Sequence, residues 1–528
     1  MKYFKLPWFL VLIFLSIPTI SAQQNSMDQI RASADALGGL DDVLSVKNIS
    51  LIGYGQWAYQ YGGGNITGDA AAPQKWNAAN DLRRVYDLEN DRFQLYERRN
   101  YLFPFAGAFG HNFAAVNQVL DGDVAYNINA DGSFRRIGDT LGQGSQRADS
   151  PRLRRYWMLS NPLTAIRTAL DERSQVGQIS TEDQLFIIPV TTKEDYHYSI
   201  GIDPVTNLPK FVRWINPQDN MGQLTYTVNF TAYLPFDNFL LPVGYNAVID
   251  WREISYMKIY VDNYLIDTDI ADLSAPASVL ATSEPVLSAP EIEATSVADH
   301  IWRLSSGTTV FEFEDHLVLY EMYGNQLQAN ASINFANTLV PGKLATHAII
   351  SHHHSDHTGG FRAAVAAGLT IISRRANEGI LREWAERRAP NFPDFLENNW
   401  QEMKFMPVDG HLRLSDSLMT VDLYWARENI HTADLIFAHA PDQKVLSEAD
   451  IATAAVDYQW WPDNYFDVIE YYNLDVEILS PVHQYIMQSP DEVREFVQGG
   501  VDRVRALCAD ELSKGHYFPG CPVQTDRF

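Results

Sequence analysis

The densest set of chemically active side chains lies in residues 351–360, which read Ser-His-His-His-Ser-Asp-His-Thr-Gly-Gly. Within it stands His352-x-His354-x-Asp356-His357. Residues two apart on an extended backbone point to the same side, so His352 and His354 can hold one metal ion together. Asp356 and His357 follow where the chain turns, and they can reach a second position nearby. The spacing predicts two metal ions roughly 3.5–4 Å apart, an arrangement used for metal-assisted hydrolysis.

The residues on either side predict how this cluster is held. Residues 346–351 are short, apolar and β-branched, which is typical of a buried strand. Thr358-Gly359-Gly360 breaks the strand, and residues 361–367 can start a helix. The ligands are therefore expected on a tight loop at the end of a strand. Imidazole suits zinc, and a mixed His/Asp set suits zinc, iron or manganese. The alternative is a solvated His-rich loop with no function.

The pattern resembles the signature of the metallo-β-lactamase fold superfamily, which is His-x-His-x-Asp-His on a loop after a strand. The resemblance implies three further ligands, and each has a candidate that matches in order and surroundings. They follow His357 at intervals of 74, 19 and 33 residues, and they are His431, Asp450 and His483. The resemblance covers about residues 301–488. It implies that His352, His354 and His431 hold one metal ion, that Asp356, His357 and His483 hold the other, and that Asp450 bridges them.

The chain departs from the family pattern beside three of these ligands. Ile430 and Val482 stand where the family usually has glycine, and Glu448-Ala449 replaces a more common aliphatic-Gly pair. Asp450 also indicates which branch of the superfamily the chain resembles. The resemblance to the thioesterase and lactonase branches implies a bridging carboxylate there, whereas the best-known zinc β-lactamases have cysteine. This lowers the expectation of β-lactamase activity.

The resemblance implies a four-layer αββα sandwich for residues 299–528, with the metal ions at one edge between the sheets. The sequence is compatible with this expectation. Residues 301–304, 309–313 and 317–320 read as a three-stranded meander. Strands then alternate with helices, one of which is expected at 376–388.

Residues 24–271 have a different character. After a helix that begins near residue 27 and ends before Gly38-Gly39, the region reads as a mostly antiparallel, aromatic-rich sheet with one inserted helix at 162–172. It weakly resembles the half-barrel of periplasmic lipoprotein carriers. It could bind an apolar ligand or part of the substrate, and the alternative is a scaffold. Residues 272–298 have a linker composition, with an extended segment laid across both domains as the alternative. The overall fold class expected is α+β.

The ends of the chain carry targeting and redox signals. Residues 1–22 combine Lys2 and Lys5 with an apolar stretch and small residues before Gln23, which is typical of a cleaved export signal. A membrane anchor is the alternative, but the apolar run is short for a span of roughly 20 residues. We therefore expect no stable membrane span and a periplasmic or secreted protein. A disulfide between Cys508 and Cys521 is expected in such a compartment, with two free thiols as the alternative.

The net charge of −26 argues against a polyanionic partner. Such a surface repels nucleic acid phosphates, and no basic patch with interleaved aromatic residues offsets it. Nucleic acid is therefore excluded as a partner, and the superfamily's nucleases are a poor guide. A small-molecule substrate is expected instead. The sequence does not indicate an oligomeric state.

Several other residues near the ligands in the sequence have no expected role in metal binding. His353 is expected to point away from the metal ions, and His439 to be a core or edge histidine. The aromatic residues of 458–461, 465–466 and 471–472 follow Asp450. In the related fold this stretch lies near the mouth of the site, so it could line a partly apolar substrate pocket, or it could pack in a helical core.

These observations predict an exported dinuclear hydrolase that cleaves an ester, thioester or lactone with a metal-bound hydroxide. Two Zn²⁺ ions are expected, with iron or manganese as alternatives, and Asp356 is expected to orient the water or move its proton. Three alternatives stay open: a β-lactamase, a mononuclear iron enzyme like the persulfide dioxygenases, and a non-catalytic lipid- or ligand-binding protein.

Overall fold

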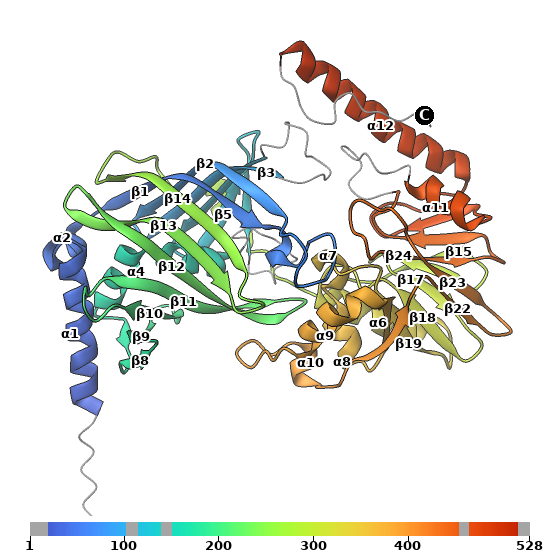
Figure 1. Cartoon of the computed structure of the whole chain (residues 1–528), viewed down its shortest axis with the longest axis horizontal. Coiled ribbons are helices and arrows are strands. Elements are labelled where there is room, and N and C mark those ends of the chain that lie inside the picture. Colours follow the sequence, from blue (N-terminus) through green and yellow to red (C-terminus); the bar gives the residue numbers. More distant parts are fainter. Residues whose placement is uncertain (1–18, 102–113, 139–149, 453–463, 516–528) are drawn as a thin grey trace, which may run out of the picture.

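The computed structural model describes residues 19–101, 114–138, 150–452 and 464–515. Two parts lie side by side along its longest axis, a large β-rich part and a layered α/β part (Figure 1). Most of the predicted export signal, residues 458–461 of the aromatic stretch and Cys521 lie outside the described residues. Cys508 is not a free cysteine. Among the described residues, no helix is both long enough and apolar enough to cross a membrane.

The N-terminal part is built on one antiparallel sheet, as predicted, because its strands follow each other through short turns. The order is β6-β5-β4-β3-β2-β1-β14-β13-β12-β11-β10-β9-β7, with β8 paired to β9. The strands are β1 (Asn48–Ala58), β2 (Trp76–Asp87), β3 (Arg92–Tyr101), β4 (Ala114–Asp121), β5 (Val124–Ile128), β6 (Phe134–Ile137), β7 (Gln175–Val176), β8 (Ser180–Glu182), β9 (Leu185–Thr191), β10 (His197–Ile202), β11 (Pro209–Gln218), β12 (Gly222–Phe236), β13 (Phe239–Ile249) and β14 (Ser255–Ile266).

Helices cover this sheet, and they differ in part from the sequence expectation. The chain opens with α1 (Thr19–Leu37) and α2 (Leu40–Ser45), separated by the predicted glycine pair. The expectation of one inserted helix is wrong, because α3 (Pro151–Leu159) precedes α4 (Pro162–Leu170). Ser150 and Asn161 cap their N-termini by accepting backbone N–H groups. Trp157 of α3 packs edge-on against the rings of Trp57 and Trp214, so the aromatic residues predicted for this sheet form its core.

The stretch predicted as a linker is laid along both parts. Leu273, Ala275 and Val279 pack against Val119 and Tyr126 of the large sheet. Short helix α5 (Ala277–Leu280) follows, and β15 (Ala294–Ala298) already belongs to the C-terminal part, where it pairs with β16 (Ile301–Leu304). The stretch packs against the large sheet at its start and pairs with the C-terminal part at its end, and residues 281–291 between them are nearly all exposed.

The C-terminal part contains two sheets. One has seven strands in the order β15-β16-β17-β18-β19-β20-β21, and the other has five in the order β22-β23-β24-β25-β26. The remaining strands are β17 (Thr309–Glu312), β18 (His316–Tyr320), β19 (Leu344–Ile349), β20 (Thr370–Arg374), β21 (Lys404–Val408), β22 (His411–Ser415), β23 (Thr420–Trp425), β24 (Ile436–Ala440), β25 (Val445–Glu448) and β26 (Ile478–Pro481). The predicted antiparallel meander is confirmed in β16, β17 and β18.

Helices on the outer faces complete the predicted αββα sandwich. A core that includes Phe311, Val318 and Ile349 of one sheet and Leu423 and Ile436 of the other lies between the sheets. The seven-stranded sheet is covered by α6 (Gln326–Leu339), α8 (Phe361–Ala366), α9 (Glu378–Glu386) and α10 (Phe395–Asn398). The five-stranded sheet is covered by α11 (Asn464–Tyr472) and α12 (Pro490–Ser513). Helix α9 lies within the expected range 376–388 and follows a 3₁₀ turn, η2 (Arg375–Asn377).

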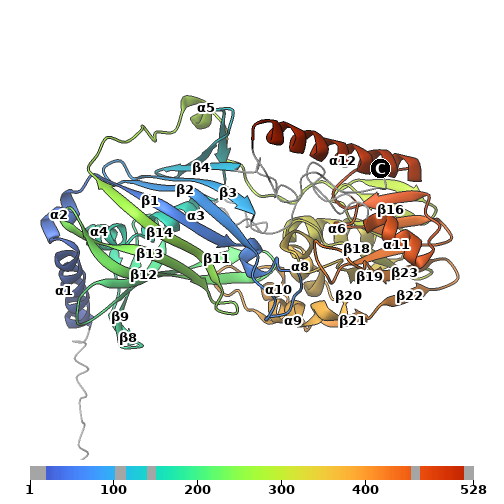
Figure 2. The same ribbon diagram turned by 45° about the horizontal axis from the view of Figure 1, so that its top comes forward.

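The two parts are joined by buried and charged contacts. One hydrophobic core runs from the large sheet into α8 and α9. Arg252 makes a two-pronged ion pair with Glu383 of α9, and Trp251 donates its indole N–H to the same carboxylate at 3.0 Å. Arg387 donates to Asp250 at 3.0 Å. Such fixed, bidentate contacts hold the β-rich domain against the helical layer beside the histidine loop (Figure 2).

Candidate metal centre

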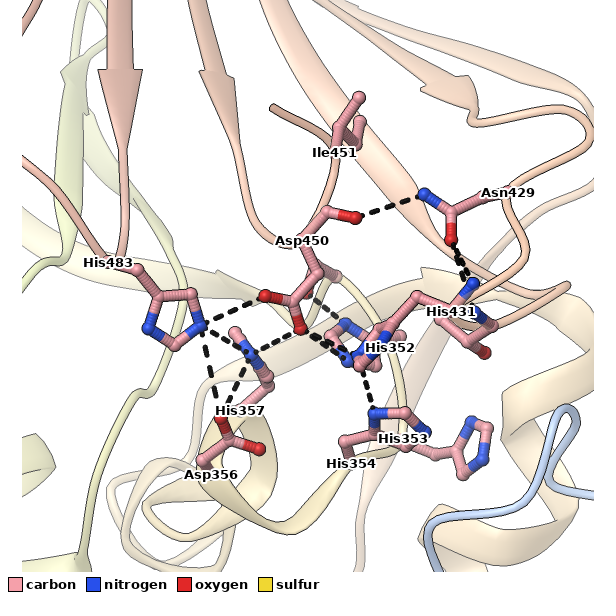
Figure 3. A network of polar contacts seen from close by, with 12 residues as sticks. His352, His353, His354, Asp356, His357, Asn429, His431, Asp450, Ile451 and His483 are labelled. Carbon is pink, nitrogen blue, oxygen red and sulfur yellow. Dashed lines mark hydrogen bonds and ion pairs between the residues drawn. The ribbon is translucent and has the colours of Figure 1, made fainter. Parts of the chain in front are cut away.

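The predicted ligands stand at the ends of strands, at one edge between the two sheets. Strand β19 ends just before the histidine loop, and the short helix α7 (Ser355–Thr358) turns the chain back. His431 lies in the connection between β23 and β24, Asp450 follows β25, and His483 follows β26. All seven predicted side chains converge at this edge (Figure 3). The structure has the expected tight loop after strand β19. The loop reverses direction through the single helical turn of α7.

Four of the side chains form a first group, His352, His354, His431 and Asp450, whose ligand atoms lie within 4.8 Å of one another. His354 Nδ1 lies 2.9 Å from His431 Nε2. His352 Nε2 and His431 Nε2 lie 3.3 Å and 2.9 Å from Asp450 Oδ2. All four residues are buried, with at most 3% of their surface exposed. This group could hold a metal ion away from solvent.

The second group consists of Asp356, His357 and His483, again with ligand atoms within 4.8 Å of one another. His357 Nε2 lies 3.3 Å from Asp356 Oδ2 and 3.2 Å from His483 Nε2. His357 is fully buried, but the side chains of Asp356 and His483 are 37% and 18% exposed. The ring of Tyr323 packs against His483 at 5.1 Å between centroids. Solvent therefore reaches this group from one side.

The carboxylate of Asp450 faces both groups. Its Oδ2 lies 3.1 Å from His357 Nε2 of the second group as well as beside the two histidines of the first. Its Oδ1 lies 3.1 Å from His483 Nε2. One carboxylate with an oxygen toward each group is the arrangement that a bridging ligand needs. Without Asp450, the two groups would have no shared negative charge between them.

The histidines are oriented by hydrogen bonds at the nitrogen that faces away from the cluster. Nδ1 of His352 lies 2.9 Å from Ser351 Oγ, and Nε2 of His354 donates to the Asn65 carbonyl at 3.4 Å. Nδ1 of His357 donates to Glu321 Oε2 at 2.9 Å. Metal-binding histidines are held in this way by outer partners, which fix the ring and its tautomer. The donor set therefore fits a divalent metal ion, with the inward nitrogen of each ring left for it.

Asp450 itself sits in a strained turn. Its φ is +56°, in the left-handed region that L-residues rarely adopt, although aspartate tolerates it better than most. Glu448 accepts the backbone N–H of Ile451 at 2.8 Å on one side. Asn429 donates to the Asp450 carbonyl at 3.0 Å on the other. Glu448 and Asn429 thus stabilise the turn that presents the shared carboxylate.

Asn429 also holds the neighbouring ligand. Its side-chain oxygen accepts the backbone N–H groups of His431 and Thr432 at 2.8 and 3.1 Å. One amide therefore ties two ligand-bearing turns together, since the same side chain donates to the carbonyl of Asp450. Ile430, between Asn429 and His431, is 45% exposed.

The electrostatics of the cluster favour the metal-binding protonation state at His352, His354 and Asp450, whereas nearby carboxylates favour a charged ring at His357. Burial, and then the charge of neighbouring imidazoles, lowers the pKa of His352 and His354 well below the usual value. These rings are neutral, as ligands must be. The pKa of Asp450 lies well below its usual value, because surrounding histidines outweigh the opposing effect of burial. Burial lowers the pKa of His357, but three carboxylates raise it well above its usual value, which marks a strongly negative pocket.

The other histidines lie where the sequence placed them. His353 belongs to neither group, and its Nε2 donates to the Asn65 carbonyl at 3.1 Å. His439 lies in the buried strand β24 and donates to the Asp475 carbonyl at 3.0 Å. Of the aromatic stretch, Tyr465 and Phe466 lie in α11, and Tyr465 packs in the core between α11 and the five-stranded sheet. These two residues therefore pack between the helix and the sheet, which was the alternative to lining a substrate pocket.

Sequence reasoning missed the outer partners of the ligands. Glu321 is fully buried, and it accepts the backbone N–H of Ser351 at 2.6 Å as well as His357. Its only signal is a carboxylate directly after the apolar strand 317–320. Gln60 and Asn65 come from the N-terminal domain, nearly 300 residues away in the chain. Nothing in their local sequence indicates that they reach the histidine loop.

Comparison with protein-family models and with curated proteins found no match. Among solved structures, the chain is similar to metallo-β-lactamases from Pontibacter korlensis, Erythrobacter litoralis and Hirschia baltica, at 13%, 14% and 14% identity. These cover 39%, 40% and 40% of this chain and 99%, 97% and 97% of their own, each with a TM-score of 0.30. Because identity and TM-score are this low, we draw nothing about activity from them.

Proposed function

We propose that the C-terminal domain is a metal-dependent hydrolase with two adjacent metal ions, most simply Zn²⁺. One observation carries this: two groups of ligand atoms lie side by side and share the Asp450 carboxylate. His352, His354 and His431 would hold one ion, and Asp356, His357 and His483 the other. The three outward hydrogen bonds to these rings support the assignment, because a decorative histidine cluster has no need of fixed tautomers.

When bound, two such metal ions supply an activated water nucleophile near neutral pH and polarise a carbonyl oxygen. The residues of the chain do the rest. Asp450 compensates the charge of both positions, and Glu321 holds the His357 ring so that its Nε2 faces the cluster. Asp356 is ionised, since His357 and His483 lower its pKa against the opposing effect of burial. Its partly exposed carboxylate can therefore accept a hydrogen bond that orients the attacking water.

We propose an acyl bond as the target, in an ester, thioester or lactone ahead of a β-lactam. The bridging position is occupied by Asp450 and not by cysteine. Tyr323 provides an aromatic wall beside the more open group, which suits a partly apolar small molecule. The net charge of −26 disfavours polyanionic substrates. The export signal proposed for residues 1–22 would place this activity in the periplasm or outside the cell.

The proposal is tested on the purified full chain, first by metal analysis and then with a panel of ester, thioester, lactone and β-lactam substrates. We expect about two Zn²⁺ per chain and turnover of at least one acyl substrate. His354→Ala should lose both, because it removes a ligand from the buried group. His347→Ala is the matched control, since His347 lies in β19 and belongs to neither group.

Two results would contradict the proposal. A chain that binds no metal, or that keeps its turnover after complete metal removal, is not a metal-dependent hydrolase. Cleavage of β-lactams alone, with no other acyl substrate turned over, would overturn the substrate ranking while leaving the metal chemistry in place.

A further inference from the structure

One segment of the N-terminal domain lies against the metal-ligand loop. It is the connection between β1 and β2, residues 59–75, which begins with the 3₁₀ turn η1 (Tyr59–Gly62). In Figure 1 this connection, in blue, reaches across to α7, and Figure 2 shows it again at the junction of the two domains. The rest of the N-terminal domain contacts α9 and Arg387 just after it, and Asn220 reaches Thr358 at the end of the histidine loop.

Several hydrogen bonds of this segment are with ligand residues or their immediate neighbours. The Asn65 carbonyl accepts from His353 and His354, and Lys75 Nζ donates to the carbonyl of His431 at 3.0 Å. The Ile66 carbonyl accepts the backbone N–H of Ala433 at 2.8 Å. The segment therefore touches the two stretches of chain that supply the histidines of the first group. It is placed by hydrogen bonds with defined direction, which general packing of two domains would not require.

Gln60 makes the most specific of these contacts. Its Oε1 accepts the backbone N–H of Ser355 at 3.0 Å, and its Nε2 lies 3.4 Å from Asp356 Oδ1. The two contacts fix the orientation of the amide, because a backbone N–H can only donate and an ionised carboxylate can only accept. Asp356 Oδ2 is then the oxygen that faces His357 and His483. Gln60 thus sets which oxygen of Asp356 is available to the second group.

The backbone at this point is strained in a way that the contacts explain. Gln60 has φ 46° and ψ 52°, and Tyr61 has φ 56° and ψ 24°, so two consecutive non-glycine residues adopt the left-handed region. Such residues persist only where the surroundings enforce them, and they concentrate at functional sites. Here the left-handed turn brings the Gln60 side chain, 8% exposed, onto the histidine loop.

We propose that Gln60 is a positioning residue for Asp356, so that the N-terminal domain completes the second metal position. This rests on the proposed function, since it requires Asp356 to bind metal. The chemistry is that of an outer partner: an amide that donates to one oxygen of a ligating carboxylate holds the other in place. Loss of such a partner typically weakens metal binding 10- to 100-fold. The effect should be confined to the second group, because the side-chain hydrogen bonds of Gln60 go to Ser355, Asp356 and Tyr59.

The test compares Gln60→Met with the wild-type full chain. Methionine keeps the length of the side chain and removes both hydrogen bonds. Zn²⁺ is titrated in competition with a chromophoric chelator, so that the two binding steps are resolved. We expect the weaker step to shift by about 10-fold or more and the tighter step to be unchanged. Gln74→Ala is the matched control, because Gln74 lies in the same segment and donates to the Lys75 carbonyl within it.

The outcomes separate this inference from the proposed function. If the wild type binds no Zn²⁺, the proposed function itself fails. If the wild type binds two ions and Gln60→Met binds both with unchanged affinity, only the role of Gln60 is overturned. Equal weakening of both steps would also overturn it, since that is the result of general damage to the domain contact. A Gln60→Met protein with a native near-ultraviolet circular dichroism spectrum and a selective loss supports the inference.

Discussion

The two ligand groups are built from similar side chains but stand in different surroundings. The first group, His352, His354, His431 and Asp450, is sealed: no member is more than 3% exposed. In the second group, only His357 is sealed, while the side chains of Asp356 and His483 are 37% and 18% exposed. A buried position holds a metal ion by excluding competing water, and an open one leaves room for a reactant. We therefore expect the first group to bind its metal ion more tightly and the second group to be the one that a substrate can reach.

The largest effect on metal binding and turnover is expected from removing Asp450, the carboxylate that faces both groups. Asp450→Ala takes away the one carboxylate that faces both, so two neighbouring cations would repel each other without compensation. We expect loss of both metal ions and a fall in turnover of more than about 100-fold, beyond what the loss of an outer partner costs. Metal analysis and turnover of the best acyl substrate measure this.

The control for Asp450→Ala is Asp409→Ala, a surface carboxylate paired with Arg375. His353→Ala provides an internal comparison, because His353 is buried beside the ligands but belongs to neither group. If His353→Ala and Asp450→Ala lowered metal content equally, the loop would be presenting a different set of its side chains than the one assigned here.

A smaller effect is expected from opening the second group alone. His483→Ala removes its most peripheral histidine, which comes from the end of β26. We expect about one Zn²⁺ per chain to remain, because the sealed group keeps all of its ligands. Turnover should still fall strongly, since the open position is the one that a substrate can approach. Metal content after gel filtration, compared between His483→Ala and His354→Ala, gives the measurement. Loss of both ions from His483→Ala would end the distinction between the two groups.

The smallest effect on metal binding is expected at a second contact between the domains. Asp219 lies in the turn between β11 and β12, and its neighbour Asn220 donates to Thr358 Oγ1 at 3.3 Å, at the end of the histidine loop. Burial raises the pKa of the Asp219 carboxyl to about 7. The folded protein therefore keeps this proton between about pH 4 and pH 7, where the unfolded chain has lost it. Stability is lost across this range as pH rises.

Asp219→Asn removes this dependence because the amide does not ionise. We expect the variant to be more stable than the wild type at pH 8, by on the order of 2–4 kcal/mol, and equally stable at pH 4. Urea unfolding at both pH values measures the difference. Both Zn²⁺ affinities should stay unchanged, in contrast to Gln60→Met. A variant that is equally stable at pH 8 would show that Asp219 ionises freely in the folded state.

The loop ligands could be named from the sequence because they follow a local strand signal, whereas His431, Asp450 and His483 were named because they match the resembled pattern in order. The four residues of the loop follow a β-branched strand, and Asp450 and His483 likewise follow apolar runs. The strands of the C-terminal meander were predictable for the same reason, since alternation and turns are local properties. The strands that the structure confirms are therefore those that neighbouring residues encode.

The parts that were missed depend on contacts far along the chain. Helix α3 has the sequence Pro-Arg-Leu-Arg-Arg-Tyr-Trp-Met-Leu, whose arginines suggest a surface segment. Arg154 is nevertheless fully buried, because it donates to the carbonyls of Val119 and Tyr126 at 2.7 Å. The roles of Gln60 and Glu321 likewise cannot be predicted from the residues next to them in the sequence. Only the folded chain brings their polar atoms to the groups that need them.

The left-handed backbone at Asp450 limits how this centre could be remodelled. Placing cysteine there would copy the ligand of the best-known zinc β-lactamases, yet the change would act on more than the donor atom. At φ +56° a residue without a side-chain oxygen near its own backbone is less well tolerated, at a cost of about 1–2 kcal/mol. The thiolate would also present one donor atom where the carboxylate presents two, so His483 would lose the contact that Oδ1 makes. Conversion to the thiolate type would therefore require the Glu448–Ile451 turn to be rebuilt along with the ligand.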